Sequence, residues 1–195
     1  MDEKAAVLRA IAGQNRGLLA TAADRARILA AIADLEALNP TPAPVTASPL
    51  LAGNWRLLYT TSRELLGLNR LPLAQLGPIY QCIRPEAARV YNLAEIVSVP
   101  ILAGLVCVAA RYEATAAQRL TVNFERAIFG LQRLLRYQSA EAMIDQIEAG
   151  QNFPPLDFRL ANRDRSGWID ITYLDDTLRI NRGNEGSVFV LAKDA

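Results

Sequence analysis

The first forty residues carry apolar side chains at the three- and four-residue spacing that is typical of amphipathic helices. The clearest apolar stripe consists of Ile28, Ile32 and Leu35. Thr21, followed by Asp24, makes a plausible N-terminal cap for this helix. A shorter helix is expected around residues 7–11, with a glycine-bounded turn between the two. The pattern therefore predicts a helical pair over residues 1–39.

Residues 40–49 interrupt this pattern because they contain four prolines, at positions 40, 42, 44 and 49. Proline lacks an amide hydrogen and has a fixed φ, so we expect an extended linker here. From residue 50 onward, the spacing of apolar and polar positions changes to one that indicates strands. Strands are predicted at about 54–61, 78–84, 88–98, 102–114, 119–128, 167–174, 177–182 and 187–193.

Several connections between these strands are too short for crossover helices, such as 115–118, 175–176 and 183–186, and this favours antiparallel hairpins. Eight antiparallel strands can close into an up-and-down barrel, which encloses either packed side chains or one small ligand. Apolar positions within 129–155 predict one inserted helical segment. The sequence thus predicts a mostly β protein, with an antiparallel barrel of about eight strands over residues 50–195.

The period of two assigns side chains to faces of the predicted strands. Within "GNWRLLYTTS" at 53–62, one face carries Trp55, Leu57 and Tyr59. If the barrel is open, inward-facing residues bind an apolar ligand, and a hydroxyl or carboxylate orients its polar head. If it is packed, the same residues form its core. The candidate ligand-binding residues are Leu57, Tyr59, Val122, Phe124, Ile171, Tyr173 and Asp175.

The composition of the chain excludes several classes of function. The chain has 195 residues, 51% of them hydrophobic, so it can bury a sizeable core, and its formal net charge of +1 gives no field that would attract nucleic acid. The absence of histidine excludes a Ser/His/Asp triad, a Cys/His dyad and imidazole metal ligands. Two cysteines, Cys82 and Cys107, cannot form a zinc site, and we expect buried thiols in preference to a disulfide. Carboxylate, lysine or cysteine chemistry passes this filter, but no constellation of residues supports a hydrolase or isomerase, so we predict no catalytic residue, metal or cofactor.

Six segments, in order from about Leu8 to Lys193, resemble the plastid-lipid-associated proteins, also called fibrillins. They are "NRGLLA" at 15–20, "LEALNPTPAP" at 35–44, "GNWRLLYTTS" at 53–62, "GPIYQCI" at 77–83, "VNFERAIF" at 122–129 and "YLDDTLRINRGNEGSVFVLAK" at 173–193. The resemblance implies a lipocalin-like barrel that associates with thylakoids or lipid globules and handles carotenoids, prenylquinones or other apolar metabolites. It also implies a distinguishing aspartate in a tyrosine-containing motif, which matches Asp175.

The N-terminal residues "MDEKAAVLRA" lack the apolar core of a secretory signal, and no transmembrane segment is predicted. A plant precursor would begin with a Ser- and Arg-rich transit peptide, so the resemblance is interpreted as one to a cyanobacterial-type member. The expected location is intracellular, either cytoplasmic or peripheral to the thylakoids of a cyanobacterium-like cell.

Gly53, Asn54 and Trp55 are similar to the Gly-x-Trp signature of lipocalins, whose tryptophan packs against an arginine from a late strand. Arg179 or Arg182 is expected to take that place through a cation–π contact, which makes Trp55 a barrel-closing residue more than a ligand contact. Asp175 and Asp176 lie at a predicted hairpin, where aspartate is common because its side chain accepts hydrogen bonds from nearby backbone amides. Adjacent residues on a strand point to opposite sides, so these two carboxylates are not expected to share a proton in catalysis. A salt link from Asp175 to Arg179 or Arg182 is favoured instead.

The segment 125–138 mixes basic and apolar side chains. If it is helical and exposed, it can rest on an anionic lipid surface, and the alternative is core packing with solvated arginines. The candidate membrane-contact residues are Arg126, Phe129, Arg133 and Arg136.

Two functions remain open. The first is non-enzymatic binding or carriage of an apolar lipid, such as a carotenoid, a prenylquinone or an acyl lipid, at or near membranes or lipid globules. The second is a structural or scaffold role on lipid bodies or membranes, with a packed barrel and recruitment of an isoprenoid-pathway enzyme.

Overall fold

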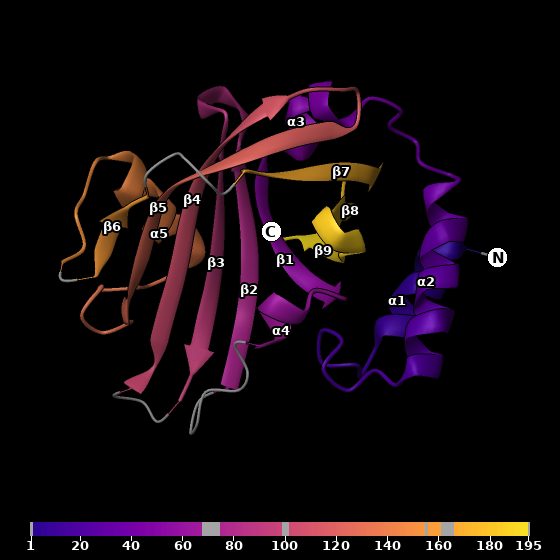
Figure 1. The fold of residues 1–195 in the computed structure, drawn as a ribbon, viewed down its shortest axis with the longest axis horizontal. Coiled ribbons are helices and arrows are strands. Elements are labelled where there is room, and N and C mark those ends of the chain that lie inside the picture. The colour runs from indigo at the N-terminus through magenta and orange to yellow at the C-terminus, as the bar shows by residue number, and fades with distance from the viewer. Residues whose placement is uncertain (1, 68–74, 99–101, 155, 161–165, 195) are drawn as a thin grey trace.

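The computed structural model describes residues 2–67, 75–98, 102–154, 156–160 and 166–194, whose strands form a closed antiparallel barrel (Figure 1). The eight barrel strands are β1 (Gly53–Thr60), β2 (Gln75–Arg84), β3 (Arg89–Val97), β4 (Gly104–Ala114), β5 (Arg119–Leu131), β7 (Ser166–Leu174), β8 (Leu178–Gly183) and β9 (Val188–Lys193). They neighbour one another in the order β4-β3-β2-β1-β9-β8-β7-β5, and pairing of β4 with β5 closes the ring. The predicted fold class is confirmed.

The two N-terminal helices cover one side of the barrel. Helices α1 (Glu3–Ile11) and α2 (Ala22–Glu36) pack on outward-facing residues of β8 and β9. The predicted cap of α2 is confirmed, because Thr21 and Asp24 form a complete capping box. Figure 1 shows this pair on the opposite side of the barrel from α5 (Ala140–Glu148) and β6 (Asp157–Arg159). Within the described residues, no helix is both long enough and apolar enough to cross a membrane.

The proline-rich stretch differs from the extended linker that was expected. It contains a short 3-10 helix, η1 (Pro44–Thr46), and the start of a one-turn helix, α3 (Ser48–Leu51). Each of these short helices has a proline in its first two positions, where the missing amide hydrogen costs no hydrogen bond. Val45 and Leu51 are buried against Trp55, so the two short helices close one end of the barrel.

The segment after β5 also differs from the prediction. Strand β5 continues to Leu131 because β4 pairs with it along its length, and α5 begins only at Ala140. Strand β6 was not predicted, since three residues are too few for a recognisable alternation. A further short helix, α4 (Arg63–Gly67), follows β1.

Three apolar clusters divide the core. One fills the barrel, one lies between the barrel and α5, and one lies under α1 and α2. Cys82 and Cys107 belong to the cluster under α5 and are free and buried, as expected. Burial raises the pKa of each thiol to about 12, so both remain protonated at neutral pH.

The turn between α1 and α2 touches β1 through Gly17, and this contact generates a prediction. Gly17 has φ +105°, and a Cβ added there would lie 2.4 Å from the Thr60 carbonyl oxygen. We expect Gly17→Ala to lower the free energy of unfolding by about 2 kcal/mol, measured by urea denaturation.

The matched control is Gly13→Ala, because Gly13 also has a positive φ, +74°, but an added Cβ would meet nothing within 4 Å. It should lose only about 1 kcal/mol from backbone strain. Equal losses for the two variants would show that the close approach of Gly17 to β1 is not what limits the residue there.

Candidate functional site

The closed end of the barrel holds a buried arginine. Arg179, on β8, is 0% exposed, and its guanidinium lies 4.8 Å from the centroid of the Trp55 ring. A desolvated contact of this kind contributes about 2 kcal/mol. One terminal nitrogen of Arg179 donates a hydrogen bond to the side-chain oxygen of Gln81 at 2.5 Å. Burial lowers the pKa of Arg179 to about 9, so the guanidinium stays charged at neutral pH.

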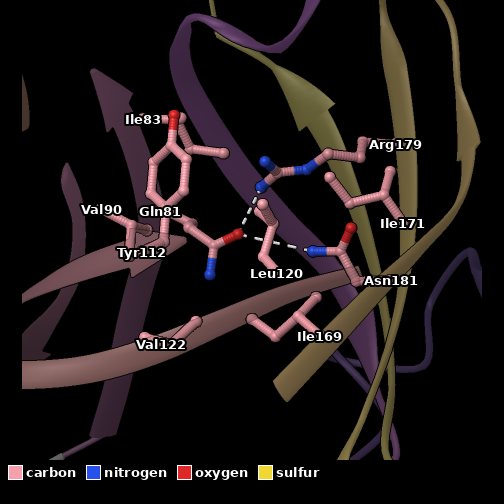
Figure 2. A pocket seen from close by; sticks show the side chains of 10 residues that line it. All are labelled: Gln81, Ile83, Val90, Tyr112, Leu120, Val122, Ile169, Ile171, Arg179 and Asn181. Carbon is pink, nitrogen blue, oxygen red and sulfur yellow. Dashed lines mark hydrogen bonds between the residues drawn. The ribbon is translucent and has the colours of Figure 1, made fainter. Parts of the chain in front are cut away.

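A cavity of about 10 Å³ lies beside Arg179 (Figure 2). A space of this size holds about one water molecule. Its polar lining consists of Gln81, Tyr112, Arg179 and Asn181. Its apolar lining consists of Ile83, Val90, Leu120, Val122, Ile169 and Ile171. The described side chains around Arg179 therefore leave almost no free space beside it.

The polar side chains around the cavity are incompletely paired. The amide nitrogen of Gln81 donates to Asn92 at 2.9 Å, which directs the Gln81 oxygen toward Arg179. That oxygen also accepts a long hydrogen bond of 3.4 Å from the Asn181 amide. In the part of the chain that the structure describes, Arg179 Nε and Asn181 Oδ1 are buried without a hydrogen-bond partner. Gln81 and Asn181 were missed as site residues, although a polar residue at an inward strand position is itself a signal.

Two β-bulges change the predicted set of inward-facing residues. Leu57, Val122 and Ile171 are buried in the cluster that fills the barrel, and Phe124 packs against it. Tyr59 and Tyr173 instead lie under α1 and α2, outside the barrel. The register shifts between Leu57 and Tyr59 and between Ile171 and Tyr173, and an extra residue at each place reverses the alternation. The expectation that both tyrosines line the barrel interior is therefore wrong.

Asp175 attaches helix α1 to the barrel. Its carboxylate accepts hydrogen bonds from Lys4 Nζ at 2.6 Å and from the Tyr173 hydroxyl at 2.7 Å. It also accepts the backbone amides of Thr177 and Leu178, which is the expected turn chemistry. Burial alone would raise the pKa of Asp175, but these hydrogen bonds outweigh it and lower the pKa to about 2.

The expected salt link from Asp175 to Arg179 or Arg182 is wrong. Arg179 points into the barrel, whereas Arg182 pairs with Glu36 of α2 at 2.6 Å. Arg179 and Arg182 lie on opposite faces of β8. The ion-pair partner of Asp175 is instead Lys4, from the far end of the sequence. Of the two candidate barrel-closing arginines, Arg179 is the one that contacts Trp55.

The segment 125–138 is not the exposed helix that was considered, because its first half is part of β5. Arg126 forms two hydrogen bonds with Asp157, at 2.8 and 2.6 Å, and one with the Gln151 carbonyl, so it is not free to contact lipid. Phe129, Arg133 and Arg136 are exposed. The membrane-contact prediction thus loses Arg126 and keeps the other three residues as a proposal.

Exposed apolar residues gather at the end of β5, in the turn that follows it and along β6. Their exposed fractions are Phe129 39%, Leu134 63%, Leu156 43% and Phe158 47%. The rings of Phe129 and Phe158 have centroids 6.5 Å apart, and the Phe129 amide donates to the Leu156 carbonyl. Exposed arginines accompany them. We define the β5–β6 patch as Phe129, Leu134, Leu156 and Phe158 with Arg133, Arg136 and Arg159.

Comparison with known proteins gives a consistent result. The family model PAP_fibrillin matches residues 1–192. The chain is 33% identical over 209 residues to "Light-induced protein, chloroplastic" of Solanum tuberosum, covering 93% of this chain and 64% of that protein. It is 32% identical over 218 residues to "Plastid-lipid-associated protein, chloroplastic" of Citrus unshiu, with 98% and 67% covered. It is 34% identical over 220 residues to "Plastoglobulin-1, chloroplastic" of Pisum sativum, with 98% and 60% covered.

These relatives correct the expected location. All three carry chloroplastic names, which overturns the prediction of a cytoplasmic or thylakoid-peripheral protein in a cyanobacterium-like cell. That prediction rested on the first residues of the sequence. Since the chain spans 64% of the Solanum protein, the position at which it begins carries no information about targeting.

The hydrogen bonds of Asp175 predict a specific pH dependence. Its pKa of about 2 in the folded state is below the ordinary value of about 4, so the charged form stabilises the fold above pH ~4 and this contribution is lost as the pH falls through ~2. We expect Asp175→Asn to lose about 2 kcal/mol of unfolding free energy at pH 7, and the difference from the parent protein to shrink toward pH 2.

Asp176→Asn is the control, because the neighbouring Asp176 is exposed and should contribute less than about 0.5 kcal/mol at either pH. Urea denaturation between pH 2 and pH 7 measures both variants. A loss for Asp175→Asn that does not depend on pH would contradict the assignment of its stabilising effect to the carboxylate charge.

Proposed function

This chain belongs to the plastid-lipid-associated protein family, the fibrillins, and on that premise we propose that it is a non-enzymatic structural protein that docks on a plastid lipid surface through the β5–β6 patch. The family match covers nearly the whole chain. The names of the Citrus and pea relatives couple those proteins to plastid lipid and to plastoglobules. We extend that association to this chain.

The observation that carries the proposal is the combination of apolar and basic groups in one place. Phe129, Leu134, Leu156 and Phe158 are all more than one third exposed. Within the described residues, Arg133, Arg136 and Arg159 form no ion pair. Apolar groups that enter a lipid interface gain about 25 cal/mol per Å² of buried area, and each arginine near an anionic surface adds about 1 kcal/mol.

The barrel interior supports a surface role better than carriage of a large lipid. Pockets that enclose small molecules have volumes of about 300–1,000 Å³. The cavity beside Arg179 has about 10 Å³, so a carotenoid or prenylquinone would enter only if the core rearranged. Carriage of such a lipid stays an alternative, and recruitment of an isoprenoid-pathway enzyme stays a prediction.

Vesicle co-sedimentation tests the docking surface. We expect Leu134→Ser to weaken binding to anionic vesicles about three- to tenfold, because it removes the most exposed apolar side chain of the patch. Arg133→Glu should weaken binding to anionic vesicles and leave binding to zwitterionic vesicles nearly unchanged.

Leu38→Ser is the matched control, since Leu38 is 60% exposed, against 63% for Leu134, but follows α2 on the other side of the barrel. It should bind as the parent protein does. Equal losses for Leu38→Ser and Leu134→Ser, with unchanged thermal unfolding, would overturn the proposal. Solvent extraction of the purified protein followed by mass spectrometry would instead favour carriage if it released a stoichiometric carotenoid or quinone.

A further inference from the structure

Arg179 carries a buried positive charge that the described part of the chain does not neutralise. Three other arginines on the barrel strands have carboxylate partners: Arg126 with Asp157, Arg119 with Asp170 and Arg182 with Glu36. Arg179 is more buried than any of these, yet within the described residues no carboxylate lies at ion-pair distance from it. Its contacts are an amide oxygen and an aromatic face, and neither cancels a full charge.

The open side of this guanidinium faces the cavity. Figure 2 shows Arg179, Gln81 and Asn181 converging on the same space from β8 and β2. Arg179 Nε has no hydrogen-bond partner among the described residues, and the Asn181 amide nitrogen is held only by a hydrogen bond of 3.4 Å. Two donor groups are thus free or weakly held, beside one unpaired acceptor, Asn181 Oδ1, whereas the oxygen of Gln81 is already used by Arg179. A site that offers donors and a positive charge binds an anion.

The size and walls of the cavity narrow the class of anion. The space of about 10 Å³ holds about one water molecule, so a carboxylate enters only if neighbouring side chains move, and the larger phosphate or diphosphate would need a larger movement. The remaining walls are aliphatic. Tyr112 and Ile169 line the cavity and are only half-buried, so rotation of these two side chains can extend it toward the barrel surface.

We propose that the cavity is a carboxylate site, in which Arg179 and Asn181 hold the head of a single-chain fatty acid and the aliphatic wall beside Ile169 receives the first part of its chain. The same chemistry would also take a small free carboxylate such as acetate. The site lies inside the barrel, so it does not depend on the surface docking proposed above.

Tryptophan fluorescence offers a local readout. The sequence has two tryptophans, and Trp168→Phe leaves Trp55, which contacts Arg179, as the only one. This variant of the full chain would be titrated with decanoate, with decanol as the uncharged ligand of equal length, and with acetate. We expect decanoate to change the Trp55 emission and to bind about tenfold or more tightly than decanol.

Substitutions at the site separate binding from folding. Arg179→Gln should weaken decanoate binding about tenfold or more, whereas Arg182→Gln, which alters the pair with Glu36 outside the barrel, should not change it. Asn181→Asp places a carboxylate of almost identical shape beside Arg179. It should raise the thermal unfolding temperature and abolish decanoate binding, because the protein then supplies its own counter-ion.

Each outcome decides the proposal. Acetate binding as tightly as decanoate would keep the carboxylate site and assign it to small free anions. Equal binding of decanol and decanoate, or unchanged binding in Asn181→Asp, would overturn it. The absence of any response of Trp55 to decanoate or acetate would also overturn it and leave a cavity that holds water only.

Discussion

The guanidinium of Arg179 over the indole ring of Trp55 is the contact around which the closed end of the barrel is packed. Trp55 donates its indole hydrogen to the Leu51 carbonyl at 2.9 Å, which attaches the one-turn helix α3 to the base of β1. Lys193, at the end of β9, also approaches this ring, with its Nζ 5.3 Å from the Trp55 ring centroid. The same Nζ donates a hydrogen bond of 3.0 Å to the Leu50 carbonyl in α3. A single aromatic ring therefore joins the linker, the first strand and the last strand.

The outer surface of the barrel under α1 and α2 depends on two β-bulges. The bulges in β1 and β7 turn Tyr59 and Tyr173 outward, where they extend the apolar surface on which α1 and α2 pack. Ion pairs then fix the two helices at separate points, Lys4 with Asp175 and Glu36 with Arg182. The side of the barrel that faces the helices is thus built from residues that regular alternation would have placed inside.

The strands and the cap of α2 were predictable because each depends on the spacing of residues that lie close together in the sequence. The closure of the barrel was predictable from the number of strands and the short connections between them. Predicted and observed strand bounds agree within three residues for most strands, as in β9, predicted at 187–193 and found at Val188–Lys193. The bulges were not predictable, since an extra residue in a strand is defined only relative to its partner strand. The partner of Asp175 was not predictable either, because Lys4 lies 171 positions away and its approach depends on how α1 docks.

Closure of the ring bears on how such a protein behaves when many copies crowd together. Every barrel strand has a neighbour on both sides, so no barrel strand is an open edge of the sheet along its whole length. In the described part of the sheet the terminal strand is β6, which has three residues and ends in an exposed arginine. An edge so short and charged is a poor template for strand addition. Copies of the chain that crowd together therefore lack a long open strand through which to join, and this disfavours their growth into fibrils.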